Sequence, residues 1–213
     1  MMALIEFLAR WGHGLFGITW IGMLYYFNFV QGEYFKEAEA DAKADALKKL
    51  APRALWWFRW GAMFTFITGL YLLHVLGKGM NQYIAVGALA GTFMFLNVWL
   101  IIWPAQKIVC GLVEGDAGAA APKALLASRT NTLLSAPMLF GMFASKHGTY
   151  SAEGFTQVIG NFTDPGLLTA LGLIVVLEIN AIFGKLGPIA SVAGVIHMSL
   201  LLTAVLFGVV HFL

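Results

Sequence analysis

The chain has 213 residues, of which 60% are hydrophobic and 11% are charged, and its formal net charge is +2. Together with a mean hydropathy of +0.79, this composition is typical of an integral membrane protein with one domain. The small and scattered charge argues against a nucleic-acid partner. The single cysteine, Cys110, excludes a disulfide framework and a site for covalent c-type haem.

Long apolar runs recur along the chain, and a membrane-spanning helix needs about 20 mostly apolar residues. They predict six transmembrane helices with soft boundaries, over residues 3–30, 54–76, 83–103, 125–146, 167–183 and 189–213. Pro104 closes the third run, Pro188 opens the sixth, and Pro137 lies inside the fourth, where it favours a kink. The expected fold is all-α: a polytopic helix bundle in which residues 1–213 form one integral membrane domain.

Two longer polar segments separate these runs. Residues 31–53 mix acidic and basic side chains with alanines, which predicts a partly helical connection, either an amphipathic surface helix or a solvated connector. Lys and Arg concentrate in the odd-numbered connections, so the positive-inside rule places those connections in the cytoplasm. We therefore expect a multi-pass protein of the bacterial inner membrane, with both termini and the connection 147–166 in the periplasm.

All five histidines lie inside an apolar run or at its end, where an imidazole is costly without a partner. His13 and His197 fall at similar central depths, about 15 Å and 12 Å from the starts of their helices. His74, His147 and His211 fall at the predicted outer ends. Such a set favours ligation of haem iron, with one or two b-type haems.

His13 is the strongest candidate ligand, and its depth makes His197 a candidate partner on the same iron. His13 shares a helix face with Arg10 and with two glycines, which let a flat ring or another backbone approach closely. Arg10 lies one turn further out, where a guanidinium would meet a haem propionate. The alternative is a packing face in which His13 forms a hydrogen bond to a neighbouring helix.

A second polar group is expected toward the cytoplasmic side of the bundle. Its members are Arg59, Asn97, Arg129, Asn131 and Glu178. Glu178 is the only carboxylate deep in an apolar run, so we expect it to pair with Arg129 or Arg59. The pair would be a salt bridge that locks the bundle, a proton relay, or a seat for an anionic, planar substrate.

Several short motifs are distinctive. They read RWGH at 10–13, GITWIG at 17–22, YYFNF at 25–29, WWFRWG at 56–61, NVW at 97–99, IWPAQK at 102–107, SRTN at 128–131 and PMLF at 137–140, followed by His147. Together they resemble the N-terminal membrane domain of bacterial cytochrome c-coupled urate oxidases (urate hydroxylases). We expect the chain to correspond to that domain without the family's C-terminal cytochrome c domain.

The resemblance implies a multi-helix membrane protein that oxidises urate and passes electrons to cytochrome c. The matching positions include His13, Arg59, Asn97, Arg129, Asn131 and His147. The resemblance therefore offers His147 as an alternative to His197 for the second ligand of the haem iron, whereas it does not include His74 and His211.

The sequence thus favours a membrane redox protein that binds b-type haem through histidine pairs. It would pass electrons from urate or a quinol to a periplasmic cytochrome c. The sequence leaves open whether the chain is itself an oxidoreductase of the urate hydroxylase type. The alternative is a non-enzymatic accessory subunit of a larger membrane redox complex, which the 24 glycines fit well. The expected partners are membrane lipid and either a periplasmic cytochrome c or that complex. The sequence leaves open whether the chain forms an oligomer. A small transporter ranks last because no repeat symmetry supports it.

Overall fold

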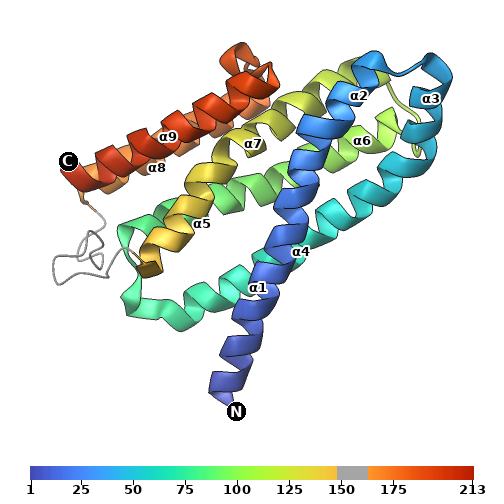
Figure 1. Cartoon of the computed structure of the whole chain (residues 1–213). Coiled ribbons are helices and arrows are strands. Elements are labelled where there is room, and N and C mark those ends of the chain that lie inside the picture. The colour runs from blue at the N-terminus through green and yellow to red at the C-terminus, as the bar shows by residue number, and fades with distance from the viewer. Residues whose placement is uncertain (148–162) are drawn as a thin grey trace.

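The computed structural model describes residues 1–147 and 163–213, and the regular structure within these ranges is entirely helical (Figure 1). The long helices are α1 (Met2–Tyr25), α4 (Ala51–Leu76), α5 (Gln82–Leu96), α7 (Ala117–His147), α8 (Pro165–Phe183) and α9 (Val192–Phe212). The all-α prediction is confirmed. Most of the predicted connection 147–166 lies outside the described residues.

Shorter helices extend or connect the long ones. They are η1 (Tyr26–Gln31), α2 (Gly32–Glu37), α3 (Ala40–Asp45), η2 (Ala46–Leu50), η3 (Gly77–Gly79), η4 (Asn97–Ile102), α6 (Trp103–Val109) and η5 (Gly187–Ile189). Of these, η1, η2 and η4 are π-helical. A π turn contains one residue more than an α turn and therefore rotates the side chains that follow it.

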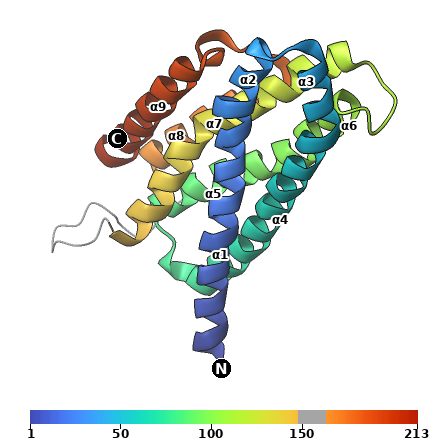
Figure 2. The ribbon, with the colours of Figure 1, turned by 45° about the vertical axis from the view of Figure 1, so that its right-hand side comes forward.

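The helices form three packed pairs. Figures 1 and 2 show α1 with α4 on one side, α8 with α9 on the other, and α5 with α7 between them. We call the end that carries α2 and α3 the inner end, and the opposite end, toward which both termini point, the outer end. The long helices alternate in direction between these two ends.

Helix α7 lies at the centre of the bundle, where it contacts α1, α5, α6, α8 and α9. Its buried residues include polar and charged ones, such as Arg129, Asn131 and Thr132. A helix enclosed by other helices can carry such side chains through a membrane, because they do not face lipid. Pro137 lies inside α7 and the helix continues through it.

Three helical segments of the described residues are long and apolar enough to cross a membrane, which indicates a membrane protein. They are Gln82–Val109, Pro165–Phe183 and Val192–Phe212. The remaining long helices contain more polar residues, and α7 keeps many of them inside the bundle. The count of six transmembrane helices and the location of the termini stay predictions.

Glycines allow the paired helices to touch through their backbones. A Cβ atom on Gly141 of α7 would lie 2.6 Å from the carbonyl oxygen of Tyr83 at the start of α5, and one on Gly166 would lie 2.6 Å from that of Val209. Such close approach by small residues is a major source of helix association in membranes, where the hydrophobic effect between helices is absent.

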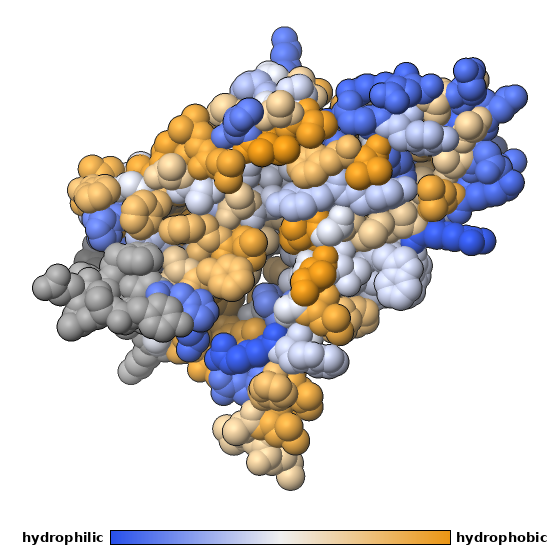
Figure 3. All heavy atoms as spheres, viewed as in Figure 1, coloured by the Kyte–Doolittle hydropathy of each residue, from blue (hydrophilic) through white to orange (hydrophobic). Residues whose placement is uncertain are grey.

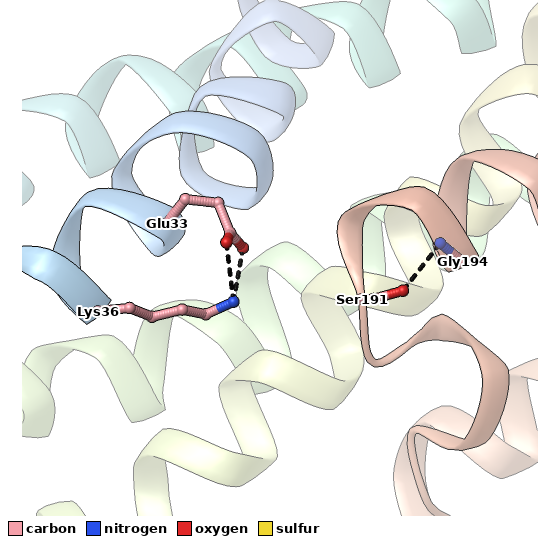
Figure 4. Close-up of polar contacts among 4 residues, drawn as sticks. All are labelled: Glu33, Lys36, Ser191 and Gly194. Atoms are coloured by element: carbon pink, nitrogen blue, oxygen red, sulfur yellow. Dashed lines mark hydrogen bonds and ion pairs between the residues drawn. The ribbon is translucent and has the colours of Figure 1, made fainter.

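Local contacts stabilise the inner end. Lys36 donates to both carboxylate oxygens of Glu33 at 2.8 and 2.9 Å, within α2 (Figure 4). The side-chain oxygen of Ser191 accepts a hydrogen bond of 2.9 Å from the backbone N–H of Gly194 and so caps α9. This cap satisfies one of the backbone donors that the first turn of a helix leaves unpaired.

We expect Gly141→Ala to lower the free energy of unfolding by about 1–3 kcal/mol, because its methyl group would overlap the backbone of α5. Gly172→Ala is the matched control in α8, since a Cβ atom there would meet nothing within 4 Å. It should be neutral or stabilising by up to about 1 kcal/mol. Thermal unfolding of the detergent-purified variants measures both. Equal stability of the two variants would refute the close α5–α7 contact.

Candidate functional site

A cavity of about 280 Å³ lies at the outer end, between the α1–α4 pair and the α5–α7 pair. Its walls are mainly apolar and include Phe66, Leu70, Leu73, Ile84 and Ala88. Figure 3 shows a hollow on this face of the molecule, with hydrophilic side chains in blue beside it. An apolar cavity with a few polar groups is the usual form of a small-molecule site.

His13 lines this cavity from α1, and its orientation is fixed by α4. The Nδ1 atom lies 2.9 Å from the carbonyl oxygen of Thr65 and 3.1 Å from the hydroxyl oxygen of Thr68. A carbonyl oxygen only accepts, so Nδ1 carries the proton and Nε2 keeps its lone pair. Metal-binding histidines typically donate their other ring N–H to a carbonyl or carboxylate in this way.

Gly69 makes room for the imidazole ring. A Cβ atom on Gly69 would lie 3.1 Å from Cε1 of His13 and 3.6 Å from its Nδ1. The absence of a side chain at this position of α4 therefore lets the ring lie close to the helix. The same position also lines the cavity.

Two basic residues stand where the cavity opens. Arg10 and Lys146 both line it and both are exposed. Arg10 is paired with Glu6 through hydrogen bonds of 2.6 and 3.0 Å, an exposed i,i+4 pair that contributes little to stability. An anionic group at the opening would therefore compete with Glu6 for Arg10 and would also meet Lys146.

The other four histidines do not belong to the cavity wall, although His74 and His147 directly follow the lining residues Leu73 and Lys146 in the chain. His74, His147 and His197 are exposed, and His211 stacks on Phe207 with ring centroids 5.4 Å apart. None of these four residues lines the cavity. The structure does not bring His197 to His13, because α5 and α7 lie between α1 and α9 (Figures 1 and 2).

Three of the five residues expected in the inner polar group do meet. The side-chain amide of Asn97 donates to Oδ1 of Asn131 at 2.9 Å and to Oε2 of Glu178 at 3.0 Å. The amide of Asn131 donates in turn to the carbonyl oxygen of Met94 at 2.9 Å. All three side chains are buried, so this chain of donors links α5, α7 and α8 inside the bundle.

The expected ion pair of Glu178 with an arginine is not formed within the part of the chain that the structure describes. The guanidinium of Arg59 instead lies 3.9 Å from the centroid of the Trp103 ring. Arg129 is buried, and its Nε and Nη1 atoms have no hydrogen-bond partner among the described residues. Arg129 and Asn131 are two residues apart, so they point to different sides of α7.

The sequence analysis did not single out Thr65 and Thr68, which hold His13. Their spacing of three residues places both on one face of α4, and this could have indicated a polar face opposite a histidine. It also did not single out Trp20, which lines the cavity. The indole N–H of Trp20 is buried without a hydrogen-bond partner in the described residues.

We expect Asn97→Leu to destabilise the protein by about 1–3 kcal/mol for each buried acceptor that loses its donor. Two acceptors are affected, on Asn131 and on Glu178. Glu178→Gln is the control, because a glutamine amide oxygen would still accept from Asn97, so its loss should be smaller. Unfolding by heat or denaturant in detergent compares the two. An Asn97→Leu protein as stable as the wild type would show that this network contributes nothing.

Comparison with known proteins bears on the middle of the chain, from the end of α4 through α7. Residues 74–163 match the family model described as "Urate oxidase N-terminal". The match therefore covers α5, η4, α6 and α7 completely. No curated protein and no solved structure matches the chain. This part of the chain is similar to the urate oxidase N-terminal family.

Proposed function

We propose that this chain is a membrane redox protein that binds a b-type haem in the outer cavity through His13. It would pass electrons from a small reductant to a periplasmic cytochrome c. The observation that carries the proposal is the placement of His13: its Nδ1 lies 2.9 Å from the carbonyl oxygen of Thr65, and its ring lines the cavity. In the neutral ring with a proton on Nδ1, Nε2 is the nitrogen that has a free lone pair. An imidazole in this state is a ready ligand for iron.

The apolar walls and the basic residues at the opening support a largely apolar occupant with an anionic edge. Its volume of about 280 Å³ is close to the lower end of the usual range of about 300–1,000 Å³ for small-molecule sites. An occupant of the size of haem would therefore leave one edge in the opening. There Arg10 and Lys146 would meet its propionates, since basic side chains bind carboxylates through charge-assisted hydrogen bonds.

The chain's own residues would have three roles. Thr65 and Thr68 orient the imidazole of His13, the apolar walls keep water away, and the basic pair at the opening compensates negative charge. Bound there, haem would supply a one-electron carrier. Because the cavity lies at the outer end, a cytochrome c would dock on the side that the positive-inside rule places in the periplasm.

Urate is the reductant that the family description favours, and its anionic, planar form suits a basic opening. A quinol is the other candidate, since it reaches such a cavity from the lipid. The chain itself would be the catalyst if urate reacts at this site, as an oxidoreductase of the urate hydroxylase type. We expect the protein in the bacterial inner membrane with multiple spans.

A second candidate function is that of a non-enzymatic subunit of a larger membrane complex. It is favoured by His197, a polar residue on the exposed face of α9 beside the exposed Ile196, Leu200 and Leu201. A polar side chain on a lipid-facing surface is costly, so a partner helix would cover this face. In that case the purified chain should bind no haem.

The proposal predicts a b-type signal in the reduced-minus-oxidised absorption spectrum of protein expressed with haem supplied. His13→Ala should lose the haem, because it removes the ligand that α4 orients. His197→Ala is the matched control and should keep it, because His197 lies on the far pair of helices. Loss of haem from His197→Ala, with the protein still folded, would instead support the histidine pair expected from depth. A wild-type protein without haem would reject the proposal.

The reductant is tested separately on haem-loaded protein with oxidised cytochrome c as acceptor. Addition of urate should reduce the cytochrome, and a short-chain quinol serves as the comparison. Arg10→Gln should slow the reaction with urate more than the reaction with the quinol, because only urate carries a charge for the opening to attract. Reduction by the quinol alone would identify this chain as a quinol-linked electron carrier.

A further inference from the structure

We propose that Met142 is the second axial ligand of the haem that His13 binds, so that the iron lies between an imidazole nitrogen and a thioether sulfur. This inference rests on the proposed haem site. It also departs from the histidine pair expected from the sequence, because the structure brings no second histidine to the cavity.

His13 and Met142 line the cavity from two different walls. The ring of His13 is held on the α1–α4 side by Thr65 and Gly69. Met142 belongs to α7 and packs against α5, with Cγ 3.4 Å from where a Cβ atom of Gly87 would be and Cε 3.7 Å from that of Gly91. A group placed between the two helix pairs would therefore be in reach of both residues, one from each wall.

The neutral oxygen-bearing side chains on the cavity walls are engaged elsewhere. The hydroxyls of Thr65, Thr92 and Ser145 donate to backbone carbonyl oxygens of their own helices, at 2.7, 2.8 and 2.7 Å. The amide of Asn81 both donates to the carbonyl of Ser145 and accepts from the N–H of Ile84, at 2.9 and 3.0 Å. The thioether of Met142 is a soft donor that suits iron in haem.

Met142 also has the freedom that ligation needs. It is half-buried, and a methionine side chain has three rotatable bonds, so its sulfur can move toward an occupant without a change in the helix. Its two glycine neighbours on α5 present no side chains that would block this movement. The helix itself is fixed, since Gly141 of α7 lies in contact with the backbone of α5.

This ligation has a functional consequence. Haem with one methionine and one histidine ligand has a higher reduction potential than haem with two histidines. A higher potential makes the ferric haem a better acceptor for an electron from a weak reductant. The electron would enter as ferric iron becomes ferrous, and it would leave to a ferric cytochrome c, which is reduced in turn.

The test is Met142→Leu, with Met138→Leu as the matched control. Met138 lies one helical turn away on α7 and is buried, but it does not line the cavity. The wild type should show a six-coordinate, low-spin ferric spectrum with the weak charge-transfer band of sulfur ligation. Met142→Leu should keep haem through His13, lose that band, become able to bind carbon monoxide in the ferrous state, and have a lower midpoint potential. Met138→Leu should match the wild type.

Met142→His is a second variant, which should restore a low-spin spectrum while the potential stays below that of the wild type. A Met142→Leu protein with the wild-type spectrum and potential would overturn the inference while leaving haem at His13 intact. Equal loss of the band in Met138→Leu would overturn it as well. Absence of haem from the wild type would instead reject the proposed function, so the two failures are distinguishable.

Discussion

Polar groups inside this bundle have to find partners within the chain, since water does not reach them and lipid offers none. The central helix α7 shows how the fold meets this condition. The amide of Asn131 donates to a carbonyl of α5, and Ser135 forms a hydrogen bond of 2.9 Å with Tyr25. Five other helices enclose α7. Hydrogen bonds from its polar residues therefore fix the three helix pairs relative to one another, and these residues do not face lipid.

The glycines make this arrangement possible. Gly141 and Gly87 bring α7 and α5 into backbone contact. The π-helical turn η4 begins at Asn97, whose amide bonds to Asn131 of α7 and to Glu178 of α8. The close packing between α5 and α7 contrasts with the cavity between this pair and the α1–α4 pair. The cavity therefore lies between two pairs whose positions are fixed elsewhere, which is the condition for a preorganised binding site.

His13 belongs both to the packed core and to the cavity. Its Nδ1 is paired like the other polar groups of the core, because it donates to a carbonyl oxygen of α4. The ring also lines the cavity, whose walls are mainly apolar. At the inner end, by contrast, the guanidinium of Arg129 is buried, and its Nε and Nη1 atoms have no hydrogen-bond partner among the described residues.

The sequence by itself determined the helical class and the apolar segments, and it placed Asn97, Asn131 and Glu178 in one polar group. These follow from hydropathy and from the cost of polar groups in lipid, which depend on residue type alone. Only the tertiary structure decided which polar groups became partners. Depth along a helix placed His13 and His197 at the same level, but it could not tell that a pair of helices lies between them. Likewise, the side of α7 on which each residue lies kept Arg129 from Glu178 and placed Met142 at the cavity.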